Sequence, residues 1–215
     1  MVPSAIGKRR SAAREEASAL YQKRRKEIVE AAVRVFNRLG FAGASVSAVA
    51  AELDIDRASL YYYVSSKEEL FDEILREVVG RTAAIARNVE SGPGDARRKL
   101  RELIVGLMTA YAQSYPLMYI YVRENLTQLG GTRAAWSRQM RKFNREIEDS
   151  VIAIVEAGYA DGSLRDVGPS RIVALGILGM LGWTHRWFHP TRSEESAEQI
   201  ARTYAEIVVS GLGAR

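Results

Sequence analysis

Arginine, serine and tyrosine side chains recur at close spacing between residues 57 and 62. A guanidinium group can donate two hydrogen bonds to O6 and N7 of guanine, and a hydroxyl group can bond to base edges or phosphates. In a helix whose N-terminal residues enter the major groove, Arg57 and Ser59 lie where base edges are read, and Ala58 also faces the DNA. Tyr61 and Tyr62 are expected to contact phosphate and sugar groups.

Three further polar residues flank this segment and are candidates for contacts with the DNA backbone. Ser45 and Ser47 open the preceding predicted helix, and Lys67 stands near the start of the following one. Each can contact phosphates together with the amides of a helix N-terminus. A second interpretation stays open for Ser45, which can act only as a helix cap. Leu60 and Tyr63 are expected to be core residues.

Two short helices are predicted to position these side chains. Ser45 can cap the first, and Asp56 can cap the second, because both residue types accept hydrogen bonds from the first free amides of a helix. Only Asp54 and Ile55 lie between the two helices. So short a connection forces a steep crossing, which predicts a helix-turn-helix.

Longer helices are predicted on both sides of this motif. An apolar repeat predicts a helix from about residue 19 to residue 39, with Gly40 at its C-terminal end. Ser65 and Glu68 have the spacing of a capping box and predict the start of another. After the Ser-Gly-Pro-Gly segment at 91–94, long helical patterns follow and no alternating strand pattern appears. The fold is therefore expected to be all α.

Positive charge is concentrated at the N-terminus. Residues 1–26 hold eight Lys and Arg side chains, Arg9 and Arg10 among them, and two Glu side chains, whereas the net charge of all 215 residues is only +5. We expect residues 1–18 to form a basic arm whose arginines enter a neighbouring minor groove. The alternatives are general electrostatic attraction to DNA and a poorly ordered, solvated tail.

The central segment closely resembles the DNA-binding signature of the TetR family of bacterial transcriptional regulators. Residues 44–71 read ASVSAVAAELDIDRASLYYYVSSKEELF. The resemblance includes the hydroxyl residue that opens the first short helix, the Val-Ala pair at 49–50, the Leu-Tyr-Tyr-Tyr run at 60–63 and the Ser-Lys-Glu-Glu-Leu run at 66–70.

Three positions depart from the family's pattern. Asp54 stands where the turn usually carries glycine, and Ala58 replaces a small residue that is often glycine. Aspartate tolerates a left-handed backbone better than most residues, so we expect the turn to form at a modest penalty. Ala58 would alter base preference. Val64 replaces the commoner phenylalanine, which is a change in packing.

The resemblance implies a three-helix helix-turn-helix DNA-binding domain at 19–80 and a helical ligand-binding and dimerisation domain at 81–215. It further implies a homodimer that binds a palindromic double-stranded operator and acts as a repressor released by a small-molecule effector. The residue pattern independently favours a dimer. Gly176, Gly179 and Gly182 recur along an apolar segment, which can pair with the helix around Ile200 in an isologous four-helix bundle. The alternative is a core within one chain.

Aromatic and basic residues of the C-terminal region are candidate ligand contacts. The set consists of Tyr111, Tyr115, Tyr119, Arg123, Trp136, Phe143, Trp183 and Arg186. An aromatic stripe at helical spacing also fits a plain hydrophobic core. The Trp-x-x-x-Trp pattern at 183–187, with an adjacent arginine before Pro190, resembles the TetR subgroup that responds to acyl-CoA thioesters. The resemblance implies an acyl-CoA effector, with a hydrophobic drug-like ligand as the alternative.

Other classes find little support in the sequence. The chain has no cysteine and no glycine-rich phosphate loop, so we expect no cofactor and no enzymatic activity. His185 and His189 lack a third histidine or cysteine ligand, so no metal site is expected. The most apolar run, at 172–183, is shorter than the roughly 20 residues that span a bilayer, and no secretory signal is seen, which predicts a cytoplasmic protein without membrane contact. A helical adaptor with a basic arm is the remaining alternative, and it leaves the helix-turn-helix unexplained.

Overall fold

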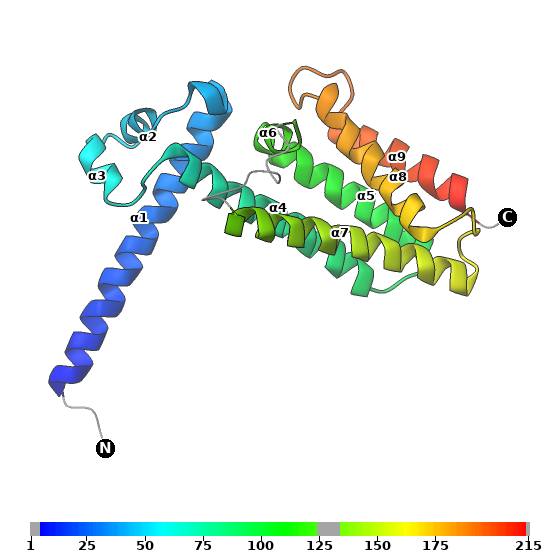
Figure 1. Ribbon diagram of the computed structural model, residues 1–215, viewed down its shortest axis with the longest axis horizontal. Coiled ribbons are helices and arrows are strands. Elements are labelled where there is room, and N and C mark those ends of the chain that lie inside the picture. The colour runs from blue at the N-terminus through cyan, green and yellow to red at the C-terminus, as the bar shows by residue number, and fades with distance from the viewer. Residues whose placement is uncertain (1–4, 124–133, 214–215) are drawn as a thin grey trace. The chain divides into compact units, whose positions relative to one another are not determined.

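The computed structural model describes residues 5–123 and 134–213, and within these ranges the side chains of residues 5–17, 119, 122, 123 and 134 lie outside the description. Apart from one isolated β-bridge between Leu164 and Gly213, the regular structure in these ranges is helical, which confirms the all-α fold (Figure 1). The chain divides into two compact units, Met1–Ile74 and Leu75–Arg215. None of the described helices is long and apolar enough to cross a membrane.

Helix α1 spans Ala5–Gly43, so the predicted start near residue 19 is wrong. Residues 8–18 contain neither glycine nor proline and consist largely of Ala, Arg, Lys and Glu, which have high helix propensity. The apolar periodicity that defined the prediction begins only where the helix meets other elements. Gly40 interrupts the helix with φ 68°, which confirms it as the break at the C-terminal end.

The helix-turn-helix is confirmed. Helix α2 spans Val46–Glu52, and the Oγ of Ser45 accepts a hydrogen bond from the amide of Ala48 at 3.1 Å. Helix α3 spans Arg57–Tyr61, and the Oδ1 of Asp56 accepts one from the amide of Ser59 at 2.8 Å. Between the helices Asp54 has φ 53°, so aspartate does occupy a left-handed position in the turn.

Helix α4 spans Lys67–Ser91, and its expected Ser65–Glu68 capping box is wrong by one residue. The Oγ of Ser66 accepts from the amide of Glu69 at 3.1 Å, and the Glu69 carboxylate accepts from the amide of Ser65 at 2.8 Å. Because two serines are adjacent, the helix could begin after either of them. The chosen register turns the Glu69 carboxylate toward Arg25, whereas Glu68 is exposed.

An aromatic cluster forms the core of the first unit. The ring of Phe36 lies 5.6 Å from that of Phe71, and Phe41 lies 4.5 Å from Phe71, measured between ring centroids. Leu60 is fully buried, as expected for a core residue, whereas Tyr63 is only half-buried. The core therefore holds the inner side of α3 and leaves its outer side in solvent.

The second unit contains the remaining helices: α5 (Ala96–Gln113), α6 (Leu117–Arg123), α7 (Ala134–Asp161), α8 (Ser170–Trp183), the 3₁₀ helix η3 (Thr184–Arg186) and α9 (Ala197–Leu212). Helix α5 packs against α9 and α7, and α7 also packs against α8 (Figure 1). Their apolar faces form one continuous core with the C-terminal part of α4.

Candidate nucleic-acid interface and interior cavity

The short helix α3 presents its polar residues to solvent. Arg57, Ala58 and Ser59 are all exposed, and Tyr61 and Tyr62 are exposed by 44% and 75%. The structure thus brings together on one surface all the candidates that the sequence indicated on the second short helix. Arg57, Ala58 and Ser59 form the N-terminal end of α3, the end by which a recognition helix enters a major groove, whereas Tyr61 and Tyr62 lie at its C-terminal end.

Internal hydrogen bonds orient this surface. The guanidinium Nη2 of Arg57 donates to the hydroxyl of Tyr61 at 2.8 Å, and its carbon lies 5.2 Å from the centroid of the Tyr61 ring. The hydroxyl of Ser59 donates to the carboxylate of Asp56, which lowers the pKa of Asp56. Because that hydroxyl hydrogen is occupied, Ser59 is left with hydrogen-bond acceptor capacity toward solvent.

The candidate phosphate contacts outside α3 differ in whether their polar groups are exposed or already hydrogen-bonded within the protein. Ser45 and Ser47 are exposed at the start of α2, and Ser45 is also the helix cap. Arg9 and Arg10 lie in α1, but their side chains are outside the described part. Lys67 is engaged within the protein, because its Nζ donates to the carbonyl oxygens of Phe41 at 3.0 Å and of Ala44 at 3.1 Å.

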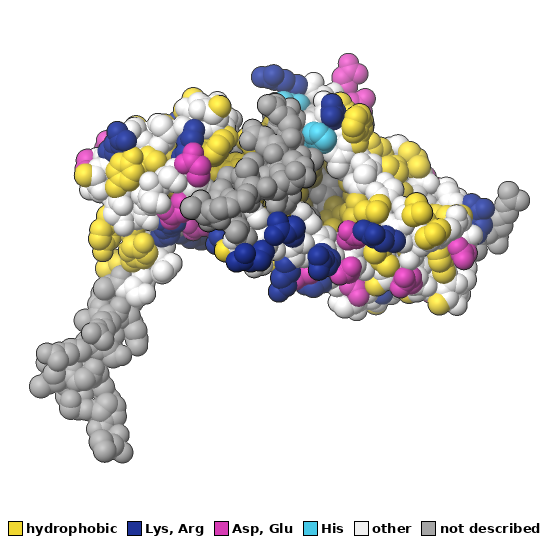
Figure 2. All heavy atoms as spheres, viewed as in Figure 1, with side chains coloured by type: hydrophobic (Ala, Val, Ile, Leu, Met, Phe, Trp, Pro, Cys, Tyr) yellow, Lys and Arg dark blue, Asp and Glu magenta, His cyan; other side chains and the backbone are white. Residues whose placement is uncertain are grey.

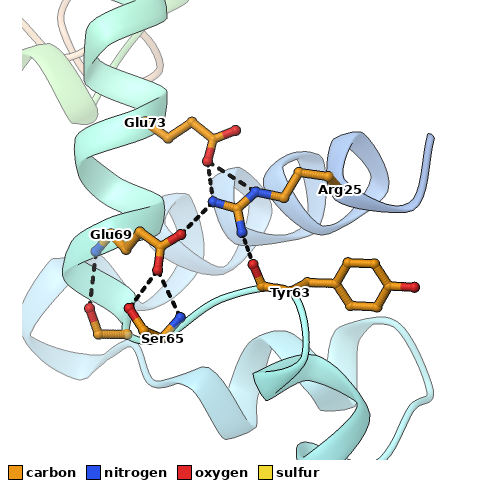
Figure 3. A network of polar contacts seen from close by, with 6 residues as sticks. Arg25, Tyr63, Ser65, Glu69 and Glu73 are labelled. Atoms are coloured by element: carbon orange, nitrogen blue, oxygen red, sulfur yellow. Dashed lines mark hydrogen bonds and ion pairs between the residues drawn. The ribbon is translucent and has the colours of Figure 1, made fainter. Parts of the chain in front are cut away.

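Arg25 is a partly buried link that the sequence did not reveal. Its guanidinium group points from α1 toward the first turns of α4, where it donates to Glu69 at 2.7 Å and to Glu73 (Figure 3). It also donates to the carbonyl oxygen of Tyr63, just after α3. One cation therefore ties together α1, α4 and the end of α3. In the sequence Arg25 was one of several clustered basic residues, and no local pattern marks a contact across 48 positions.

The charges of this network reinforce each other. Partial burial acts to lower the pKa of Arg25, but the hydrogen bonds to Glu73 and Glu69 outweigh it and raise that pKa. Partial burial likewise acts to raise the pKa of Glu69, but the hydrogen bonds from Ser65 and Arg25 lower it. Both groups therefore stay ionised at neutral pH.

Tyr21 is a second contact that sequence reasoning missed. Its ring stacks on that of Tyr63 at 5.1 Å and meets the ring of Tyr62 edge-on at 6.2 Å. Offset-stacked and edge-on aromatic pairs are favourable arrangements. The exposed Tyr62 is thus supported by α1 from behind.

The second unit contains a partly open cavity of about 380 Å³. Its wall comes from α4 to α8 and is formed by Thr82, Leu107, Met108, Tyr111, Met118, Tyr121, Asn144, Ile147, Glu148, Leu178, Leu181 and Gly182. A few polar groups interrupt an otherwise apolar surface, which is the usual character of a small-molecule site. The hydroxyl of Tyr121 accepts from the amide of Asn144 at 2.9 Å, and burial raises the pKa of Tyr121, so the phenol stays neutral.

Of the candidate ligand contacts with described side chains, Tyr111 lies in the cavity wall and the others do not. Trp136 is buried edge-on to Tyr121, and Phe143 packs against Gly80. Tyr115 contacts the ring of His189. Trp136 is thus buried and Phe143 packs against the core, and a ligand contact by any of the three stays a prediction.

The remaining candidates are placed differently. Trp183 is 57% exposed, and the guanidinium carbon of Arg186 lies 4.8 Å from the centroid of its ring. The side chains of Tyr119 and Arg123 lie outside the described residues. Cavity residues such as Tyr121 and Asn144 were missed because they belong to helices far apart in the sequence, and only the packing of those helices brings them together.

Two family descriptions match the chain. Residues 28–74 match "Bacterial regulatory proteins, tetR family", and residues 93–212 match "Tetracyclin repressor-like, C-terminal domain". The first match contains the helix-turn-helix and the second contains most of the cavity wall.

Similar proteins are named as transcriptional repressors. The HTH-type transcriptional repressor KstR2 of Rhodococcus jostii is 28% identical over 191 residues, which cover 88% of this chain and 91% of that protein. The HTH-type transcriptional repressor NicS of Pseudomonas putida is 30% identical over 142 residues, 66% of each chain.

Solved structures share the fold. KstR2 of Mycobacterium tuberculosis has a TM-score of 0.74 at 22% identity, covering 89% of this chain and 96% of that one. AibR, determined in complex with isovaleryl coenzyme A and operator DNA, has a TM-score of 0.69 at 23% identity, with coverage of 86% and 97%. FadR of Bacillus subtilis, in complex with stearoyl-CoA, has a TM-score of 0.68 at 18% identity, with coverage of 86% and 98%.

Proposed function

We propose that this chain, which belongs to the TetR family of bacterial regulatory proteins, is a cytoplasmic repressor that binds a palindromic operator as a homodimer and leaves it when an acyl-CoA thioester binds. The observation that carries the DNA-binding part is the exposed polar surface of α3. The cavity in the second unit carries the effector part.

DNA recognition follows from the side chains around α3. Arg57 and Ser59 read base edges, with Arg57 as the donor to guanine and Ser59 as an acceptor. The exposed hydroxyls of Tyr61 and Tyr62 bond to the phosphate and sugar groups beside the groove. Lys67 and Arg25 hold α1, α3 and α4 in place and so preserve the angle at which α3 enters the groove.

Dimerisation is supported by apolar surface that one chain leaves uncovered. Ile172 and Leu175 on α8 are exposed by 67% and 45%, and Ile207 on α9 is exposed by 54%. A Cβ atom added at Gly176 or Gly179 would meet no other atom within 4 Å, so another backbone can approach closely there. Two copies related by a twofold axis cover these faces and present two α3 helices to two half-sites.

The effector assignment rests on the cavity and on structural relatives. A volume of about 380 Å³ lies in the usual range for small-molecule sites, and its wall suits an acyl chain. Two proteins with the same fold were determined with acyl-CoA esters bound. Release from DNA requires that the effector bind more tightly to a conformation whose paired heads no longer match the half-site spacing.

The experiment is a footprint of the purified protein on DNA from its own genomic neighbourhood, repeated with acyl-CoA esters of increasing chain length. We expect a protected palindrome that survives competitor DNA and is lost when one ester class is added. Arg57→Ala should lose this protection, and Arg98→Ala, an exposed change on α5, is the matched control. Protection without sequence preference would refute the regulator, whereas a specific footprint that no CoA ester relieves would refute only the effector.

A further inference from the structure

We infer that the outward face of α7 beside the cavity is an anion site, which holds the phosphate-bearing head of an amphipathic effector while the apolar part occupies the cavity. We define the cationic face of α7 as Arg138, Arg141, Lys142 and Arg145, all of which are exposed. The inference rests on the proposed effector function and names the residues that recognise the charged part of the ligand.

The cationic face is continuous with the cavity. A shallow groove of about 430 Å³ is lined by Arg141, Asn144, Arg145, Glu148, Asp149 and Arg171. Asn144 and Glu148 also line the cavity, so the two hollows share a rim. A second groove of about 300 Å³ continues outward past Arg138 and Lys142. At 3.6 residues per turn, Ile147, Asn144, Arg141 and Arg138 follow one another around α7 from the cavity to solvent.

Lys and Arg side chains gather over the part of the molecule where Figure 1 places α7 (Figure 2). Of the three acidic residues that line the grooves, Glu146 and Glu148 form ion pairs with basic residues, and Asp149 is exposed in both grooves. Glu148 pairs with Arg171 at 2.9 Å, and Glu146 pairs with Arg87 and, at 3.8 Å, with Lys142. Together the two grooves are lined by five Lys and Arg side chains and three Asp and Glu side chains, so positive charge is in excess there.

Like charges stand at helical spacing on the cationic face. Arg138 and Lys142 are four residues apart, as are Arg141 and Arg145, and like charges at this spacing destabilise a helix. Arg138 and Arg145 form no ion pair with the part of the chain that the structure describes. Elsewhere the same spacing is used for opposite charges, as between Arg98 and Glu102. A bound anion would reduce the repulsion of Arg138 and Arg145 by their basic neighbours.

Phosphate suits this face better than a single carboxylate. One guanidinium group satisfies a carboxylate through two parallel hydrogen bonds, whereas several guanidinium groups along two grooves match a head that carries several phosphates. The acyl chain is then drawn into the cavity past Asn144 and Glu148, and the head stays at the surface. A coenzyme A thioester has this division of charge and apolar surface, and a free fatty acid lacks it.

The test compares two probes that share an acyl group. Octanoyl-CoA carries the phosphates, and octanoyl-N-acetylcysteamine carries the same thioester without them. The variant is Arg138→Gln/Arg145→Gln, because neither side chain forms a described ion pair, and Arg98→Gln is the control. Binding is measured by calorimetry at two salt concentrations, with circular dichroism to verify folding.

We expect the double variant to bind octanoyl-CoA about tenfold more weakly and to lose most of the salt dependence of binding, with the uncharged thioester unaffected. Equal affinity of the wild-type protein for both probes, or an unchanged affinity of the double variant for octanoyl-CoA, would overturn the anion site and leave the cavity's role intact. Failure of both probes to bind would instead overturn the proposed effector, and this inference with it.

Discussion

Replacing Lys67 by methionine separates two roles for this residue, a direct phosphate contact and an internal brace. Methionine keeps a flexible apolar stem of similar length but removes the ammonium group. That group donates to the carbonyl oxygens of Phe41 at 3.0 Å, Ala44 at 3.1 Å and Ala42 at 3.4 Å, and lies 4.8 Å from the centroid of the Phe41 ring. It thus satisfies carbonyls at the C-terminal end of α1 that have no partner in the helix.

The expected loss of stability follows from these contacts. A hydrogen bond from a charged donor contributes about 1.5–3 kcal/mol, and a cation over an exposed aromatic ring adds about 0.5–1 kcal/mol. The three hydrogen bonds share one donor group, so their energies do not add, and the longest is weak. We therefore expect Lys67→Met to lower the free energy of unfolding by about 2–3 kcal/mol.

Urea unfolding of the full chain measures this loss, with Lys23→Met, an exposed change on α1, as the control. DNA binding as a function of salt then separates the two roles. Loss of a phosphate contact reduces the log–log salt slope by about one, whereas loss of a brace leaves the slope unchanged. Unaltered stability together with a reduced slope would show that Lys67 acts on DNA directly, and would refute the brace.

Three other outcomes test the remaining argument. Asp54→Gly should raise the free energy of unfolding by about 0.5–1 kcal/mol in urea titrations, because φ is 53° there, and no gain over Asp54→Ala would contradict the strain. The folded state lowers the pKa of Glu69 below its ordinary value near 4.5. The stabilisation that ionised Glu69 contributes is therefore complete above that pH and is lost as the pH falls through the lowered pKa. Glu69→Gln should flatten this acid dependence of stability, and an unaltered profile would exclude Glu69 as its source. Arg57→Ala should cost about 1–3 kcal/mol at one base position in competition binding, and equal losses on random DNA would remove Arg57 from base reading.

Much of the DNA-binding unit could be predicted because its signals are local. Ser45 and Asp56 cap their helices through residues three positions away, and Asp54 enters the left-handed region because of its own side chain. The exposure of Arg57 and Ser59 follows from the burial of Leu60 on the same helix. The prediction of the helix cap was wrong because Ser65 and Ser66 could each cap α4 equally well on local grounds. Ser66 is the cap in the structure, and with this cap the Glu69 carboxylate contacts Arg25, which lies far away in the sequence.

The cavity could be predicted only as a general expectation. Tyr111 was found, but Tyr121, Asn144 and Met108 carry no mark in the sequence that separates a cavity wall from a core. Their shared surface depends on how α5, α6 and α7 pack, which is decided by contacts between residues far apart in the chain. Trp183, which the sequence pattern indicated as a ligand contact, is exposed outside the cavity wall, and its contact with a ligand stays a prediction.

The sequence by itself determined the all-α fold, the helix-turn-helix and the side chains that α3 exposes, because caps, turns and helical periodicity act over a few residues. Only the tertiary structure decided what Lys67 and Arg25 do, since the same charge serves a phosphate or a carbonyl according to what lies beside it. It also decided where the cavity opens and that the cationic face of α7 adjoins it. These features arise between elements, where geometry is set by packing rather than by local preference.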